Sequence, residues 1–320
     1  MIIHGILYAG GNTYRGVIFA YRPATGTWAK LASGPAPKMA QTTDTAVWTG
    51  SEMLVLGLTS AAYNPARGTW RLLARGPYPA GGAAVAWTGH QVIIWGGVCC
   101  AGLSADGASY TPATDAWQKL PTAPLQPQRD AMGAWTGKEM IVAGGYTGTL
   151  GSTQKLLRNA AAYNPVTRTW RKLPPMPGPR YGATAVWDGI EVLFLGGMLP
   201  GANAPSATAV AYNPATNRWR SLPAMEFGRS QFAAVRTGRH VLVWGGMTGT
   251  FGAQVIPPHG SAYNPVTNQW SVLPQAPLRG RANPTAVWTG STMIVWGGQI
   301  PGALNNTPLT DGAAYTPGTQ

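Results

Sequence analysis

The sequence predicts an all-β fold of repeated four-stranded units. A tyrosine is followed seven residues later by a tryptophan six times, and successive tyrosines are 42 to 53 residues apart. Short apolar runs of strand length, such as residues 293–296, recur between turns rich in the 43 glycines and 28 prolines. A period near 50 residues is typical of stacked supersecondary units. The pairs are Tyr21 and Trp28, Tyr63 and Trp70, Tyr110 and Trp117, Tyr163 and Trp170, Tyr212 and Trp219, and Tyr263 and Trp270, with Tyr315 starting a seventh copy.

Each repeat is expected to contain four short strands, A to D. Residues 281–288, 292–296 and 312–315 exemplify strands A, B and C, and residues 270–273 exemplify strand D. Thr-Gly after the tryptophan that ends strand A predicts a tight A–B hairpin, because glycine tolerates positive φ. Asn-Pro-Ala-Thr at 213–216 predicts an equally tight C–D turn. The B–C segments, such as 146–158, are much longer than hairpin loops, so we expect binding on the side that carries the B–C and D–A loops.

A glycine doublet closes strand B in most repeats, before the tyrosine and the tryptophan. The doublets are Gly96-Gly97, Gly144-Gly145, Gly196-Gly197, Gly245-Gly246 and Gly297-Gly298. This pattern resembles the kelch-repeat family of β-propellers, including the bacterial kelch and galactose-oxidase-like central-domain proteins, and the resemblance covers the whole chain. The expected strands number six A, seven B, seven C and six D, which predicts seven four-stranded blades, the first lacking strand A and the last lacking strand D, with six blades as the alternative.

Residues 1–320 are expected to form a single propeller domain. Residues 1–5 align with 293–297 in mid-repeat, so we expect the natural chain to begin further upstream. The compartment stays open, because a leader upstream of Met1 would make the protein secreted or extracytoplasmic.

The charge and hydropathy patterns narrow the possible partners. The net charge is +13, but six cations lie one or two residues after a strand-D tryptophan and predict a basic belt on the outer rim rather than a nucleic-acid site. No apolar run reaches the roughly 18 residues of a membrane helix. We therefore expect a monomer without nucleic-acid or membrane partners.

Three arginines stand seven residues before the end of strand A, and strand A is expected to be innermost. Converging there, their planar guanidinium groups would line the channel mouth and suit a carboxylate ligand. The other interpretation is that they bond loop carbonyls and brace neighbouring blades. The resemblance implies that kelch propellers use arginines in this register for both purposes. The predicted ligand-binding residues are Arg180, Arg229, Arg281, Arg129 (one register away), Tyr146, Tyr181, Gln231 and Asn283.

Candidate catalytic residues are few. Glu226 lies three residues before Arg229, and Asp130 lies beside Arg129, so either can supply acid–base chemistry next to an anion site. The resemblance extends to sugar-acid mutarotases and copper radical oxidases, but no tyrosine here neighbours a histidine, as the oxidases' copper ligands require. Of the four histidines only His259 lies in a B–C loop, so we expect no metal and no cofactor. The adjacent Cys99 and Cys100 follow a glycine doublet and are a candidate redox-sensitive loop, either as thiols or as a strained disulfide.

These observations favour a non-catalytic binding scaffold. Its ligand would be a sugar acid, a glycan, an acidic peptide or a protein partner held on the loop side. The alternative is an acidic-sugar mutarotase or isomerase, and a module that only binds proteins also stays open.

Overall fold

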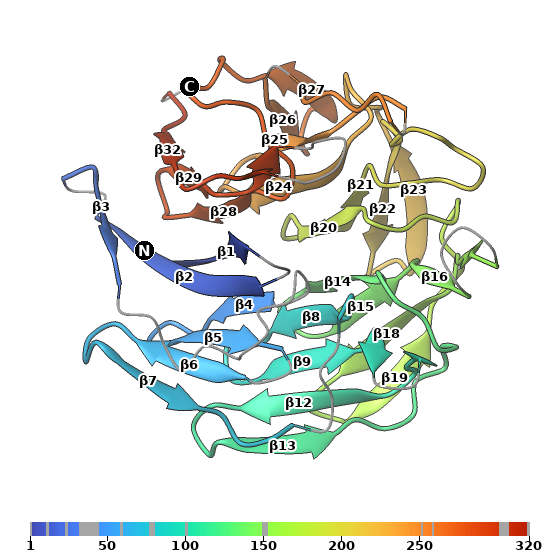
Figure 1. Cartoon of the computed structure of the whole chain (residues 1–320). Helices are drawn as coiled ribbons and strands as arrows, with labels where there is room; N and C mark the ends of the chain where they lie inside the picture. Colours follow the sequence, from blue (N-terminus) through green and yellow to red (C-terminus); the bar gives the residue numbers. More distant parts are fainter. Residues whose placement is uncertain are drawn as a thin grey trace. The chain divides into compact units, whose positions relative to one another are not determined.

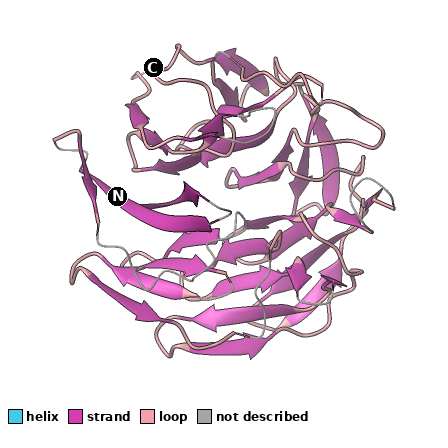
Figure 2. Cartoon of the chain, in the orientation of Figure 1, coloured by secondary structure: helices cyan, strands magenta, loops and turns pink. Residues whose placement is uncertain are grey.

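The computed structural model describes residues 2–10, 13–22, 25–31, 45–57, 60–76, 81–99, 102–148, 153–250, 252–257, 259–300 and 307–318. These residues form strands, turns and loops, with no helix among them (Figure 2). The predicted all-β class is confirmed. In particular, no helix in this described part is long and apolar enough to cross a membrane.

The chain divides into two compact units, residues 1–140 with 161–172, and residues 141–160 with 173–320. Three antiparallel sheets of three or four strands lie entirely within the first unit, and their strands are labelled in Figure 1. Sheet β1-β2-β3 is formed by Ile2–Gly10, Thr13–Arg22 and Thr27–Lys30. The four-stranded sheets are β4-β5-β6-β7 (Thr45–Trp48, Met53–Leu56, Ala61–Asn64, Thr69–Leu72) and β8-β9-β12-β13 (Ala84–Trp87, Val92–Trp95, Gly107–Thr111, Ala116–Lys119).

The boundary between the units falls within the strands of the sheet β14-β15-β18-β19. These strands are Met132–Trp135, Met140–Ala143, Ala160–Asn164 and Thr169–Lys172. The second unit contains β20-β21-β22-β23 (Thr184–Trp187, Val192–Leu195, Ala209–Asn213, Arg218–Leu222) and β24-β25-β26-β27 (Ser230–Arg236, Val241–Met247, Ser261–Asn264, Gln269–Val272). It also contains the three-stranded sheet β28-β29-β32 (Thr285–Trp288, Met293–Trp296, Gly312–Tyr315).

The sheets have the strand order predicted for kelch blades. Six of the described sheets begin with an A strand and form the six-bladed arrangement that was the alternative above. Among the described residues, the further sheet β1-β2-β3 contains no strand A and the last sheet contains no strand D, so these residues do not form the seven four-stranded blades expected first. Strand A is shorter than predicted in the last blade, beginning at Thr285 rather than at residue 281. The expectation of one domain over residues 1–320 stays a prediction.

Some long B–C loops contain two-stranded ribbons. They are β10-β11 (Val98–Cys99, Gly102–Leu103), β16-β17 (Tyr146–Thr147, Lys155–Leu156) and β30-β31 (Gln299–Ile300, Thr307–Pro308). Pairing within each ribbon forms hydrogen bonds between backbone N–H and C=O groups, which in an irregular loop would have to bond water.

The core lies on strands B and C of each blade. All four residues of β9, β15 and β21 are buried, which explains why strand B reads as a continuous apolar run. The strand-C tyrosine packs on the strand-D tryptophan opposite it; Tyr212 and Trp219, for example, have ring centroids 5.0 Å apart. These aromatic pairs explain the period that first identified the repeat.

Candidate functional site

Three buried arginines lie at the predicted register in the second unit. Arg180 is 3% exposed, and Arg229 and Arg281 are fully buried. Each precedes strand A of its blade, and each donates from Nη1 to the carbonyl oxygen of the first glycine in the doublet 16 residues later, at 3.0–3.1 Å. The acceptors are Gly196 for Arg180, Gly245 for Arg229 and Gly297 for Arg281.

The same side chains also bond the far end of the B–C loop. Arg229 Nη2 donates to the His259 carbonyl oxygen at 2.7 Å, and Arg180 Nη1 donates to that of Thr208 at 2.9 Å. Arg281 Nη1 reaches Asp311 Oδ1 at 2.7 Å. The guanidinium groups thus bond the ends of the long loops, the second interpretation given above. Direct contact between these arginines and a ligand stays a prediction.

Burial sets the charge properties of this register. Desolvation lowers the pKa of Arg180, and it lowers the pKa of Arg229 to about 10. The hydrogen bond from Arg281 holds the pKa of Asp311 below its usual range. Arg180 and Arg229 are therefore costly buried cations, stabilised by hydrogen bonds to the loop ends, whereas Arg281 is also paired with the Asp311 carboxylate.

Arg129 lies outside the buried register. The residue in that register is Gln128, whose carbonyl oxygen accepts from the second glycine of the Gly96-Gly97 doublet, just as the Arg180 carbonyl accepts from Gly145. Gln128 is buried, whereas the Arg129 side chain is one-third exposed, with Nε 3.6 Å from Asp130 Oδ2. Burial raises the pKa of Asp130, and the charge of Arg129 opposes this rise.

Two residues after the buried Gln128, Arg229 and Arg281, the backbone adopts a positive φ. Asp130, Gln231 and Asn283 have φ of 53°, 56° and 50°, and glycines occupy the equivalent positions 82 and 182. In the second unit, the Asn283 N–H donates to the Gln231 carbonyl oxygen at 2.7 Å, and Asn283 Nδ2 donates to Gln231 Oε1 at 3.0 Å. Both side chains are exposed. We call Gln231 and Asn283 the amide pair; it is the part of the predicted site that the structure brings together at the surface.

The predicted tyrosines also contact each other. Tyr146 and Tyr181 form an edge-to-face pair with centroids 5.1 Å apart and planes at 70°. Tyr146 is 2% exposed, so its ring is part of the core, whereas Tyr181 is half-buried. Of the two rings, Tyr181 is the one that a ligand can reach.

The catalytic candidates lie in different units, Asp130 in the first and Glu226 in the second. The Glu226 side chain is 46% exposed, and its Oε2 is 3.7 Å from His259 Nε2. The His259 ring packs on Phe227, with centroids 5.6 Å apart. A carboxylate and an imidazole therefore face each other near the end of a B–C loop.

The cysteine loop is only partly described. The backbone of Cys99 pairs with Gly102 in the β10-β11 ribbon, and Cys100 lies outside the described residues. The thiol or disulfide state stays a prediction. Within the described part of the chain, no cluster of three or more His, Cys, Asp or Glu side chains can hold a metal ion.

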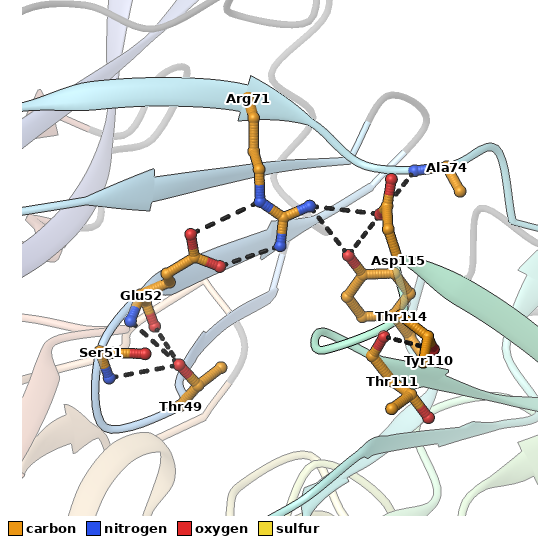
Figure 3. A network of polar contacts seen from close by, with 9 residues as sticks. All are labelled: Thr49, Ser51, Glu52, Arg71, Ala74, Tyr110, Thr111, Thr114 and Asp115. Carbon is orange, nitrogen blue, oxygen red and sulfur yellow. Dashed lines mark hydrogen bonds and ion pairs between the residues drawn. The ribbon is translucent and has the colours of Figure 1, made fainter. Parts of the chain in front are cut away.

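Sequence reasoning missed a network that neutralises part of the basic belt (Figure 3). Arg71, directly after a strand-D tryptophan, donates from Nη2 to Glu52 Oε2 at 2.9 Å and from Nη1 to Asp115 Oδ1 at 3.2 Å. Tyr110 donates its hydroxyl to Asp115 at 2.6 Å, and burial raises the pKa of Tyr110 to about 12. In the same way, an arginine after the strand-D tryptophan pairs with a glutamate of the A–B turn in two other blades, Arg171 with Glu139 and Arg220 with Glu191.

A repeated sequence signal predicts these ion pairs. Wherever an arginine follows the strand-D tryptophan, a glutamate stands four residues after the strand-A tryptophan of the same blade. These cations are paired within the protein, which weakens the attraction of the belt for polyanions.

Comparison with known proteins supports the repeat assignment. Residues 136–177 match the family model described as Kelch motif. That segment contains the Gly144-Gly145 doublet, Tyr163 and Trp170, in the order found in the other copies. No curated protein matches the chain. Because blades of the same design repeat along the sequence, this match supports a kelch-type β-propeller fold for the described part of the chain.

Proposed function

We propose that this kelch propeller is a non-catalytic binding scaffold and that the amide pair Gln231–Asn283 contacts an acidic ligand. The observation that carries the proposal is the positive φ of these two exposed, polar, non-glycine residues at equivalent positions of adjacent blades. Glycine fills the same position in other blades without strain. Retention of side chains there favours a role for the side chains themselves.

The free-energy cost of a positive φ differs between Gln231 and Asn283. Asparagine adopts the left-handed region comparatively easily, but for glutamine it costs on the order of 1 kcal/mol. The backbone bond from Asn283 to the Gln231 carbonyl holds the two residues together. The pair therefore presents preorganised amide groups, which keeps the entropic cost of ligand binding low.

The charge of the protein favours an acidic ligand, a sugar acid, a glycan or an acidic peptide. The net charge is +13, and amide N–H groups donate readily to carboxylate oxygens. In this proposal Arg180, Arg229 and Arg281 do not contact the ligand; they hold the loops in place through their bonds to backbone carbonyl oxygens. Tyr181, the accessible member of its aromatic pair, offers a ring for stacking on a sugar.

Saturation-transfer NMR tests this proposal. The panel contains glucuronate, galacturonate, an acidic peptide and, as neutral references, glucose and galactose. We expect saturation transfer to the acidic members, lost in a Gln231→Ala/Asn283→Ala double variant and retained in the control Gln118→Ala, another exposed glutamine. Equal transfer to neutral and acidic sugars, retained binding in the double variant, or silence across the panel would each contradict the proposed site.

A second candidate, acidic-sugar mutarotase, is favoured by one observation, the facing carboxylate of Glu226 and imidazole of His259. Ring opening needs only a modest acid–base group beside an anion site. Exchange spectroscopy between the anomer signals of glucuronate measures this activity. Loss of exchange in Glu226→Gln would support it, and either no exchange with the unmodified protein or full exchange in both Glu226→Gln and Asp130→Asn would exclude it.

A further inference from the structure

The three buried arginines differ in the acidic group that balances their charge. Arg281 is paired with the Asp311 carboxylate, from Nη1 to Oδ1 at 2.7 Å and from Nη2 to Oδ2 at 3.1 Å. Burial lowers the pKa of Arg229, and the charge of Glu226 acts in the opposite direction. Burial also lowers the pKa of Arg180, but here no carboxylate of the described residues opposes it. Arg180 is therefore the buried cation whose charge is left unbalanced in this part of the chain.

The segment that carries Arg180 and the loop that it bonds contain no acidic residue. They are the D–A connection, residues 173–183, and the B–C loop between β21 and β22, residues 198–208. The next D–A connection carries Glu226, but the carboxylate of that residue faces the His259 ring. The Nε atom of Arg180 is buried and has no hydrogen-bond partner among the described residues. Because burial removes water from both the charge and this N–H group, an anion close to Arg180 would be stabilising.

Thr208 occupies the position that Asp311 occupies in the last blade, directly before strand C. The carbonyl oxygen of each residue accepts from the first N–H of the glycine doublet, at 3.1 Å from Gly196 and at 3.0 Å from Gly297. It also accepts from Nη1 of the buried arginine, at 2.9 Å for Thr208 and at 3.2 Å for Asp311. The backbone contacts are thus the same, and a hydroxyl group stands in one blade where a carboxylate stands in the other.

A chain of hydrogen bonds leads from Arg180 to the surface of the protein. Arg180 Nη2 donates to Thr208 Oγ1 at 3.2 Å, and the backbone N–H of Thr208 donates to Ser206 Oγ at 3.0 Å. The two hydroxyl oxygens are 2.8 Å apart. One hydroxyl hydrogen forms the bond between them, so the other is free to donate outward. Since Thr208 is exposed and Ser206 is half-buried, a ligand can reach this donor.

We propose that the hydroxyl pair Ser206–Thr208 binds an oxyanion, with the positive charge of Arg180 behind it. One oxygen of the anion accepts from the free hydroxyl group, and the guanidinium group attracts the negative charge where screening by water is weak. The anion balances the charge of Arg180 as the Asp311 carboxylate balances that of Arg281. Carboxylate and phosphate groups share this chemistry. The site uses neither residue of the amide pair, so it does not depend on the proposed function.

Isothermal titration calorimetry of the full chain at pH 7 and constant ionic strength tests the site, with inorganic phosphate and acetate as probes. We expect saturable binding, at least about tenfold weaker in a Ser206→Ala/Thr208→Val double variant, because a hydrogen bond to a charged group is lost. Thr208→Ser keeps both hydroxyl groups and should retain the affinity within about threefold. Tighter binding of phosphate would assign the site to phosphate-bearing ligands, and tighter binding of acetate would assign it to carboxylates.

A carboxylate introduced at position 208 separates this site from the basic surface as a whole. Thr208→Asp copies the arrangement of Asp311, so it should abolish the binding of both anions. It should also raise the Tm measured without added anion by about 2 °C or more, because it balances a buried charge. The control Asn203→Asp adds the same charge to an exposed position of the same loop, five residues earlier, and should change neither measurement.

Three outcomes would overturn the inference. The first is the absence of saturable binding of either anion. The second is unchanged affinity in the double variant, which would place the anions elsewhere on the basic surface. The third is an equal effect of Thr208→Asp and Asn203→Asp on binding and Tm. If circular dichroism shows that the double variant does not fold, the comparison of the two aspartate variants still decides.

Discussion

Replacement of Arg229 by alanine tests whether the buried arginines hold the loops. The side chain is fully buried and donates to the carbonyl oxygens of Gly245 and His259 at 3.0 and 2.7 Å. The two acceptors belong to opposite ends of one B–C segment. The substitution leaves both carbonyls without their charged donor and removes the aliphatic stem of the side chain.

The expected loss follows from three contributions. Two hydrogen bonds from a charged donor contribute about 3–6 kcal/mol together, and burial of two methylene groups adds about 1.6 kcal/mol. Against these, burial lowers the pKa of Arg229 from the ordinary arginine value to about 10. That lowering corresponds to about 3 kcal/mol of desolvation, which the alanine variant recovers. The net loss of unfolding free energy is therefore about 2–5 kcal/mol.

Urea unfolding followed by tryptophan fluorescence measures this loss. The matched control is Arg279→Ala, an exposed arginine in the following D–A segment, for which the change should stay within about 0.5 kcal/mol. A loss below about 1 kcal/mol in Arg229→Ala would refute the bracing role. If that stable variant also lost its acidic ligand, the arginine would be a direct ligand contact.

Three further predictions concern a glycine doublet and two carboxylates. Gly246 has a φ of 86°, and an added Cβ would lie 2.6 Å from a backbone oxygen. Gly246→Ala should therefore lower the unfolding free energy measured in urea by about 2–4 kcal/mol, whereas the control Gly178→Ala, which has open space around it, should not lower it. Arg281 lowers the pKa of Asp311, so its stabilisation is complete above the unfolded pKa near 4 and is lost as pH falls through the folded value; Asp311→Asn should flatten the acid limb of a Tm profile, and an unchanged limb would contradict this. Burial raises the pKa of Asp130, so its neutral form stabilises the fold at low pH and this contribution is lost as pH rises through the folded value; Asp130→Asn should therefore gain stability relative to the unmodified protein between pH 3 and 7, and a constant difference would count against it.

The periodic residues predicted the fold because their roles depend on local chemistry. The Thr-Gly and Asn-Pro turns, the apolar strand B and the Tyr–Trp pairs each place one residue type at a fixed distance from the next, and the structure repeats them in sheet after sheet. The extent of strand A was less predictable. Its first residues bond loops instead of the neighbouring strand, and no local signal marks where the ladder begins.

The candidate site was harder to predict because burial depends on the loops that cover a residue. The sequence predicted the position of Arg180, Arg229 and Arg281 before strand A, but guanidinium groups at this position can be either exposed or buried. The covering B–C segments decide between them, and these segments differ in length and composition between blades. The positive φ of Gln231 was equally hidden, because glutamine carries no turn signal of its own.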